Sequence, residues 1–223
     1  MKKIPKDIIK EENILNQLIR ELKIQMFLDH PNIIKLYGFF HDKEAIYLLL
    51  ELGSSGQLYK VIKERERMSE SSTSYTIKQV CEAVRYLHFF KIIHRDLKPE
   101  NIVIQSVQHE FTQGTVKLCD FGWAVCRGTE LRSTFCGTPL YVSPEILKGQ
   151  LYDEKIDLWA IGILTYELLF GTIPFEINRE EELVKIVRPP LTADQRGDRL
   201  PAEHSSLRRS QRLCFANSEK EPR

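Results

Sequence analysis

Six polar side chains stand between two apolar segments in the stretch IIHRDLKPENIVI, residues 92–104. Its ends, 92–93 and 102–104, have the β-branched composition of buried strands. Burying ionisable groups without partners is costly, so a plain strand would avoid them. The types and spacing of these side chains therefore indicate a functional loop held by its apolar flanks.

Three oxygen-bearing side chains recur in order along this part of the chain. Asp96 and Asn101 lie in H-R-D-L-K-P-E-N, and Asp120 opens D-F-G directly after a predicted strand, residues 116–118. Carboxylate and amide oxygens are ligands that Mg²⁺ takes, and this set fits a magnesium ion held against substrate phosphates. In that arrangement Asn101 and Asp120 face the metal, and Asp96 is free to accept a hydroxyl proton. Lys98 can place a cation beside a transferring phosphoryl group.

Each short motif has a structural alternative. H-R-D alone fits a surface loop with a salt bridge, and D-F-G alone fits a turn. The two motifs in this order, with D-F-G at the close of a strand, favour phosphoryl-transfer chemistry.

Helical and strand patterns surround these motifs. Apolar side chains at helical spacing predict helices, and short β-branched runs predict strands. GSSG, residues 53–56, is predicted to be a flexible joint. The stretch 157–170 is apolar nearly all round, which predicts a helix at the centre of a core. The predicted order is helix 8–28, strands 33–40 and 45–52, helices 57–67 and 71–90, a polar loop 105–114, strand 116–118, an irregular segment 121–145 and helix 157–170.

Composition excludes several classes of protein. The net charge is +1, which gives no electrostatic case for binding nucleic acid or an anionic membrane. The longest apolar run, near 158–170, is too short to span a bilayer, and the N-terminus lacks the apolar core of a secretion signal. The five cysteines are odd in number and form no CxxC pair, so neither disulfides nor zinc are expected. An intracellular, reducing compartment is predicted.

Residue usage changes at about position 187. Residues 1–187 hold 22 Ile, whereas residues 188–223 hold none and contain 7 Arg. The last segment also lacks periodicity, so we expect a divergent and poorly ordered tail over 188–223.

The motifs together resemble the signature set of eukaryotic protein kinases. H-R-D-L-K-P-E-N, D-F-G, P-E at 144–145 and D-L-W at 157–159 carry the resemblance, which covers about residues 2–186. The resemblance implies an α+β, two-lobe protein-kinase-like fold, with a partial small lobe over 1–52 and a truncated, helical large lobe over 53–187. The sequence most closely resembles the Aurora group of Ser/Thr kinases. The Aurora-like segments are D-F-G-W-A-V (120–125), L-R-S-T-F-C-G-T (131–138), Y-D-E-K-I-D-L-W (152–159) and R-E-L-K-I-Q (20–25). Trp123 and Gln25 are uncommon at these positions among kinases generally, and both are Aurora-like.

The resemblance implies ATP and Mg²⁺ as cofactors and roles for residues of the larger lobe. Asp96 is implied as the catalytic base and Lys98 as the cation that steadies the γ-phosphate. Asn101 and Asp120 are implied as the metal ligands. Thr138 is implied to lie near Asp96 and to shape the acceptor site.

It also implies a nucleotide site on the small lobe. Lys2 corresponds to the lysine of the family's third strand, with Glu21 as its ion-pair partner on the following helix. Leu50 corresponds to the gatekeeper, and the backbones of Glu51 and Gly53 to the hinge that binds adenine. Glu100 is implied to lie near the ribose and to offer its carboxylate to a substrate arginine.

The segment 120–145 corresponds to the activation loop. Thr134 matches the family's phosphorylated threonine, with Arg95 as the partner of the phosphate. Arg132 lies two residues before Thr134, at the offset that Aurora-like kinases favour in substrates. The resemblance implies protein substrates with Arg N-terminal to the acceptor Ser/Thr, an activator protein on the small lobe, and a place in the cytoplasm, nucleus, spindle or centrosome.

The sequence departs from the family pattern in three places. There is no G-x-G-x-x-G, the similarity ends near Ile186, and 24 residues separate Asp96 from Asp120, which indicates a surface insertion in the 105–114 loop. The first two favour a truncated, misjoined or alternatively spliced product. The alternatives to an active kinase are a non-catalytic binding module and a small-molecule phosphotransferase. The stretch G-T-P-L-Y-V-S-P-E, residues 137–145, resembles a loop that binds a peptide, which disfavours the phosphotransferase.

Overall fold

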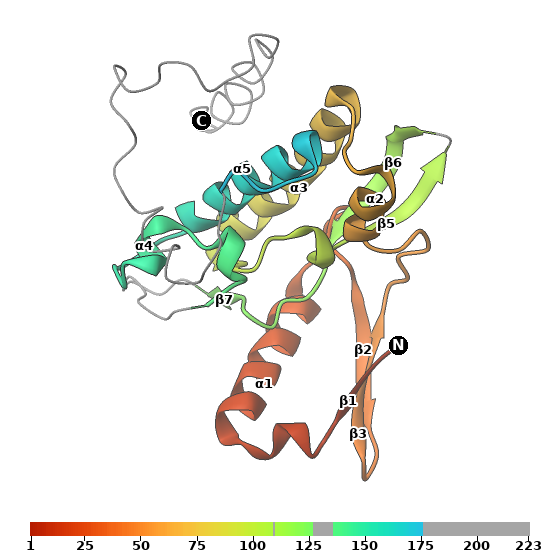
Figure 1. Cartoon of the computed structure of the whole chain (residues 1–223). Helices are drawn as coiled ribbons and strands as arrows, with labels where there is room; N and C mark the ends of the chain where they lie inside the picture. Colours follow the sequence, from red (N-terminus) through yellow and green to blue (C-terminus); the bar gives the residue numbers. More distant parts are fainter. Residues whose placement is uncertain (109, 127–135, 176–223) are drawn as a thin grey trace, which may run out of the picture.

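The computed structural model describes residues 1–108, 110–126 and 136–175. Over these residues a small sheet with one long helix is followed by a helical region, from which a β-hairpin projects (Figure 1). No helix in this part of the chain is both long and apolar enough to cross a membrane. The predicted tail, 188–223, and Thr134 lie outside the described residues.

The small lobe is a three-stranded antiparallel sheet covered by a helix. The strand order is β1 (Lys2–Pro5), β3 (Ala45–Leu50) and β2 (Leu36–His41). The helix α1 (Glu12–Phe27) follows a short 3-10 turn, η1 (Ile8–Lys10), so the predicted helix 8–28 is interrupted by the extended Glu11. Apolar side chains of η1, α1 and the sheet form one buried cluster: Ile9, Leu18, Leu22, Leu36 and Leu48.

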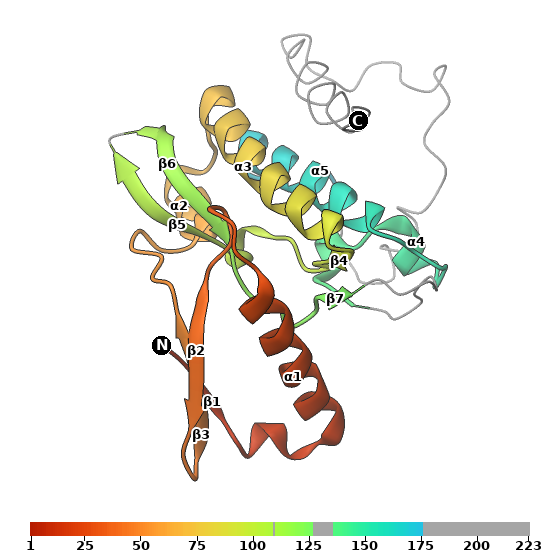
Figure 2. The same cartoon turned by 180° about the vertical axis from the view of Figure 1, so that it is seen from behind.

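The larger lobe is built on two long helices that lie side by side, α3 (Glu70–Phe89) and α5 (Lys155–Phe170) (Figure 2). α2 (Leu58–Arg65) and α4 (Pro144–Leu147) flank them. The three helices predicted over 57–67, 71–90 and 157–170 are thus present. α5 is not buried all round as predicted: Leu164 and Leu168 are fully buried, whereas Leu158 is 45% exposed.

Both apolar ends of the opening stretch form strands. β4 (Ile92–Ile93) pairs with β7 (Val125–Cys126), and β5 (Ile102–Gln108) begins directly after the 3-10 turn η2 (Pro99–Asn101). A third 3-10 turn, η3 (Pro139–Tyr141), precedes α4. The four described cysteines, 81, 119, 126 and 136, form no disulfide with one another.

The prediction of a polar loop over residues 105–114 is wrong. This segment continues β5 and begins β6 (Glu110–Leu118), and the two strands form an antiparallel hairpin with two irregularities in register. Val107, Phe111 and Thr112 are residue types that favour strands, and pairing extends from the neighbouring apolar residues into the polar stretch. On α3, the side chain of Gln79 donates to the carbonyl of Gly114 (3.0 Å) and accepts from the N–H of Val116 (3.1 Å).

The predicted flexible joint at 53–56 is also held in place. The N–H of Ser55 donates to the carbonyl of Ile104 at 2.9 Å, and the N–H of Ile104 donates to the carbonyl of Gly56 at 2.8 Å. Gly56 has φ +82°, a left-handed conformation that suits glycine. The connection between the lobes is therefore attached to β5 rather than free.

Candidate active site

The loop after β4 is held from below by one buried carboxylate on α5. Asp157, 1% exposed, accepts hydrogen bonds from the backbone N–H groups of His94 (3.0 Å) and Arg95 (2.9 Å), and its Oδ2 lies 2.8 Å from Nε2 of His88. Arg95 has φ +69°, which is unfavourable for a non-glycine residue. The bonds to Asp157 offset that cost, so a helix 60 residues later in the chain fixes the conformation of the loop.

The carboxylate of Asp96 is the centre of a compact hydrogen-bonded cluster. Nδ2 of Asn101 donates to its Oδ2 and to its backbone carbonyl, each at 2.8 Å. Nζ of Lys98 lies 2.9 Å from Oδ2, and the hydroxyl of Thr138 donates to Oδ1 at 2.8 Å. Lys98 also donates to Thr138 Oγ1 at 2.6 Å. The structure therefore brings together Asp96, Lys98 and Thr138, the residues predicted around the acceptor site, and adds Asn101, which was predicted as a metal ligand.

A second group of charges lies on the small-lobe side. Nζ of Lys2 on β1 lies 3.4 Å from Oε1 of Glu21 on α1 and 3.9 Å from Oδ1 of Asp120. Burial raises the pKa of Glu21, the Lys2 ammonium opposes that shift, and the charge of Asp120 adds to it. The predicted pairing of Lys2 with Glu21 is thus present as a contact, nineteen residues apart in the chain.

The backbone that carries Asp120 is held by α1. Asp120 has φ +63°, and Gln17 donates from Nε2 to the carbonyl of Gly122 at 2.6 Å. A Cβ on Gly122 would lie 3.2 Å from Oδ1 of Asp120, closer than ordinary contact. Glycine at this position therefore lets the D-F-G turn fold tightly beside the carboxylate.

A pocket of about 190 Å³ is lined by the Lys2–Glu21–Asp120 group and, from the Asp96 cluster, by Asn101 alone. Its walls come from β1, α1, the end of β3, η2 and the residues after β6. Asp96, Lys98 and Thr138 are not in its lining but lie next to it through Asn101. The lining residues are Lys2, Glu21, Gln25, Leu50, Gln57, Glu100, Asn101, Cys119 and Asp120.

Six of the eight residues predicted for the nucleotide line this pocket, whereas Glu51 and Gly53 do not. The backbone N–H of Glu51 donates to the carbonyl of Lys35 at 2.8 Å, which leaves its carbonyl as the group for a ligand. Gly53 packs against Val103: a Cβ on Gly53 would lie 2.8 Å from Cβ of Val103. Only glycine therefore lets this segment approach β5 so closely.

The oxygen set fits magnesium. The amide nitrogen of Asn101 is used by Asp96, so its oxygen is the atom available to a cation, and the side chain of Asp120 is 49% exposed. The described residues contain no cluster of three or more His, Cys, Asp or Glu arranged for a metal. Mg²⁺ is commonly held by one or two carboxylates together with substrate phosphates, which matches so sparse a set.

Several residues of the site were not predicted. Gln57 and Cys119 line the pocket; burial, followed by the charge of Asp120, raises the pKa of the Cys119 thiol to about 12. The sequence signal for Cys119 was its place directly before D-F-G. Asp157 was noted only as part of D-L-W, and nothing local in the sequence shows that it supports the loop.

Glu167 on α5 was also missed. Burial raises its pKa to about 7, and the charge of Glu100 adds to the shift. The hydroxyl of Tyr141 donates to its Oε2. Two carboxyl groups from distant parts of the chain therefore act on one another beside the segment that follows Thr138.

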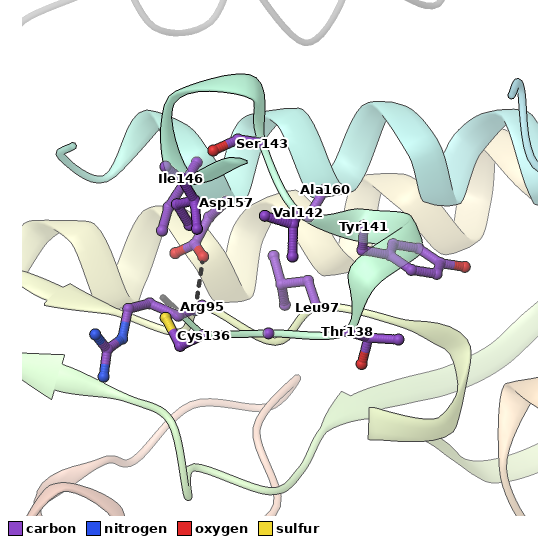
Figure 3. A pocket seen from close by; sticks show the side chains of 12 residues that line it. Arg95, Leu97, Cys136, Thr138, Tyr141, Val142, Ser143, Ile146, Asp157 and Ala160 are labelled. Atoms are coloured by element: carbon purple, nitrogen blue, oxygen red, sulfur yellow. Dashed lines mark hydrogen bonds between the residues drawn. The ribbon is translucent and has the colours of Figure 1, made fainter. Parts of the chain in front are cut away.

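A separate, water-sized cavity of about 10 Å³ lies under that segment (Figure 3). Arg95, Cys136 and Asp157 contribute to its walls, and it is distinct from the larger pocket. The guanidinium of Arg95, predicted to meet a phosphate on Thr134, donates to the carbonyl of Trp123 (2.6 Å) and to the hydroxyl of Tyr152 (2.9 Å).

The chain is similar in sequence to known proteins. The family model of the protein kinase domain matches residues 1–213. The chain is 45% identical over 183 residues to an Aurora kinase of Candida glabrata, covering 81% of this chain and 49% of the relative. It is 47% identical over 178 residues to an Aurora kinase of Eremothecium gossypii, covering 79% and 46%. To Aurora kinase A-B of Xenopus laevis it is 38% identical over 204 residues, covering 89% and 48%.

The chain thus spans about half the length of the curated relatives that it matches. The family match covers nearly all of the chain and includes every residue of the Asp96 cluster and of the pocket. The predicted family, and with it the two-lobe α+β fold class, is confirmed: the chain belongs to the protein kinase family and is similar to Aurora kinases.

Proposed function

We propose that this chain binds ATP with Mg²⁺ and transfers the γ-phosphate to Ser or Thr residues of proteins. One observation carries the proposal: the Lys2–Glu21–Asp120 group lines one pocket together with Asn101, and Asn101 bonds the carboxylate of Asp96. This observation supports Asp96 as a proton acceptor beside a pocket whose charges suit phosphates.

Asp96 and Lys98 have different roles in the transfer. Asp96, fixed by three donors, accepts the proton of the incoming hydroxyl as that oxygen bonds to phosphorus and ADP departs. Lys98, between Asp96 and Thr138, stabilises the negative charge on the transferring phosphoryl group. The fixed positions matter because preorganised groups need no rearrangement during the reaction.

The pocket residues bind the nucleotide. Lys2, oriented by Glu21, pairs with the ATP phosphates, and Asn101 and Asp120 supply oxygens for magnesium. When bound, the metal neutralises charge on the phosphates. Leu50, the backbones of Glu51 and Gly53, and Glu100 complete the adenine and ribose sites.

The acidic pair Glu100 and Glu167 supports substrates with Arg on the N-terminal side of the acceptor. Burial, followed by the charge of Glu100, raises the pKa of Glu167, and a guanidinium placed between the two carboxylates would relieve their repulsion. The resemblance to Aurora kinases also supports regulation by phosphate on Thr134, which would pair with Arg95. An activator protein on the small lobe and a place in the cytoplasm, nucleus, spindle or centrosome complete the proposal.

The direct test is phosphate transfer by the 223-residue chain to an Arg-Arg-x-Ser peptide, with MgATP. Asp96→Asn should lower the rate by about 10²- to 10⁴-fold, the usual contribution of a catalytic acid or base. Asp29→Asn is the matched control, because the side chain of Asp29 is exposed and pairs with Lys35 at the surface (3.0 Å). A folded wild-type chain that binds MgATP but transfers no phosphate would instead support a non-catalytic binding module.

The regulatory part of the proposal has its own test. The Thr134→Val variant should be less active than wild-type enzyme that carries phosphate on Thr134. Its activity should equal that of dephosphorylated wild-type enzyme. Equal activity of wild-type preparations with and without phosphate on Thr134 would overturn it.

A further inference from the structure

A buried lysine outside the Asp96 cluster is paired with a carboxylate. Lys117, on β6, is 7% exposed, and its Nζ lies 3.0 Å from Oε1 of Glu51. A buried ammonium is costly unless it is paired, so this contact must be kept in the folded protein. Neither side chain lines the nucleotide pocket.

Three donors converge on the carboxylate of Glu51. Besides Lys117, Nε2 of Gln105 donates to Oε1 at 2.7 Å and the backbone N–H of Lys35 donates to Oε2 at 3.2 Å. Burial alone would raise the pKa of Glu51; the bonds from Lys117 and Lys35 outweigh it and lower that pKa. Glu51 is therefore held as a carboxylate between β2 and the β5–β6 hairpin.

The same hairpin holds the rest of the segment that connects the lobes. Gly53 packs on Val103, and Ser55 and Gly56 exchange backbone hydrogen bonds with Ile104. The segment 51–56, whose backbone we assign to adenine, is thus attached along its length to β5 and β6.

The hairpin also carries both proposed metal ligands at its base. Asn101 directly precedes β5, and Asp120 follows two residues after the end of β6. The N–H of Cys119 donates to the carbonyl of Asn101 at 2.9 Å, which ties the two ends together. Lys117 therefore lies three residues before Asp120, on the strand that leads to it.

We propose that Lys117 is a positioning residue for the nucleotide: through Glu51 it fixes the adenine-binding segment at a set distance from Asp120. The inference rests on the proposed function and adds a residue to it. An adenine site and a metal site on separate elements must be kept in register for one ATP to reach both. Small misplacements of bound groups have large kinetic effects.

The test compares Lys117→Met with Lys155→Met in the full chain. Lys155→Met is the matched control, because it removes an ammonium that is 76% exposed and paired with Asp153 at 3.5 Å. Lys117→Met should raise the KM for ATP and the Kd for MgADP by about 10-fold, within the range expected for a small misplacement. The KM for the Arg-Arg-x-Ser peptide should not change. Lys155→Met should change none of these values.

A purely structural role for Lys117 would lower the midpoint of thermal unfolding but leave the two KM values in their wild-type ratio. That result, or an unchanged affinity for MgADP in folded Lys117→Met, would overturn the inference. If Lys117→Met does not fold, the double variant Glu51→Gln, Lys117→Met decides by the same criteria, since it leaves no buried charge unpaired. Failure of the wild-type chain to bind MgADP would instead contradict the proposed function.

Discussion

The two sides of the candidate active site are held in different ways. The Asp96 cluster is buried and closely bonded, with four contacts between 2.6 and 2.9 Å among its side chains. The Lys2–Glu21–Asp120 group has longer contacts, 3.4 and 3.9 Å, and the side chains of Lys2 and Asp120 are 43% and 49% exposed. Exposed ion pairs contribute little to stability, whereas buried hydrogen-bonded groups are costly to leave without partners.

The two sides should therefore differ in how much their side chains contribute to the stability of the fold. The catalytic loop is built by bonds that the folded protein needs, so changes there should affect both folding and activity. The nucleotide side is placed by its backbone elements, so its side chains should be replaceable with little loss of stability. Three variants test this contrast, in order of decreasing effect on the free energy of unfolding, and a fourth, Glu167→Gln, tests the pH dependence of stability.

Asp157→Ala should have the largest effect. It leaves the buried N–H groups of His94 and Arg95 without an acceptor, and we expect a loss of about 3 kcal/mol in the free energy of unfolding, as for buried hydrogen bonds to a charged group. Urea unfolding measures the loss. Asp29→Ala, at an exposed position, is the control, and equal losses in both variants would contradict the assigned role of Asp157.

Thr138→Val should have a moderate effect on stability and a clear one on rate. It removes the hydroxyl that bonds both Asp96 and Lys98, at a cost of about 1 kcal/mol. Because Asp96 loses one of the donors that fix it, kcat should fall while the KM for ATP stays the same. A change confined to the KM for ATP would place Thr138 on the nucleotide side instead.

Lys2→Met should change the free energy of unfolding by less than about 1 kcal/mol, since its ion pairs are partly exposed. The affinity for MgATP should nevertheless fall, because Lys2 is assigned to the phosphates. Isothermal titration and urea unfolding of the same preparation give both quantities. A stability loss as large as that of Asp157→Ala would remove the contrast between the two sides.

Glu167→Gln should alter the pH dependence of stability. The pKa of Glu167 is raised from 4.5 to about 7 in the folded protein, so the folded state binds a proton that the unfolded state has released. The stability from this group is complete below pH 4.5 and is lost as the pH rises through 7. The wild type should therefore lose stability relative to Glu167→Gln over this interval. A difference independent of pH would contradict the assignment.

Much of the fold and of the site could be predicted from local sequence. The helices near 58–65, 70–89 and 155–170 and the strand pair 36–41 and 45–50 follow from periodicity, and the order of Asp96, Asn101 and Asp120 indicated their common site. The hairpin at 105–114 could not be predicted, because strand pairing through a polar stretch depends on its partners more than on its residues. The same holds for Asp157, Glu167 and Lys117, whose partners lie far away in the sequence.

The support of the catalytic loop by Asp157 has a consequence for the order in which the protein becomes competent. During synthesis the loop 94–101 leaves the ribosome long before residue 157, and its left-handed Arg95 then lacks the acceptor that holds it. Docking of α5 is therefore the step that matures the loop. A nascent chain arrested before that helix would carry every residue of the Asp96 cluster without its working geometry.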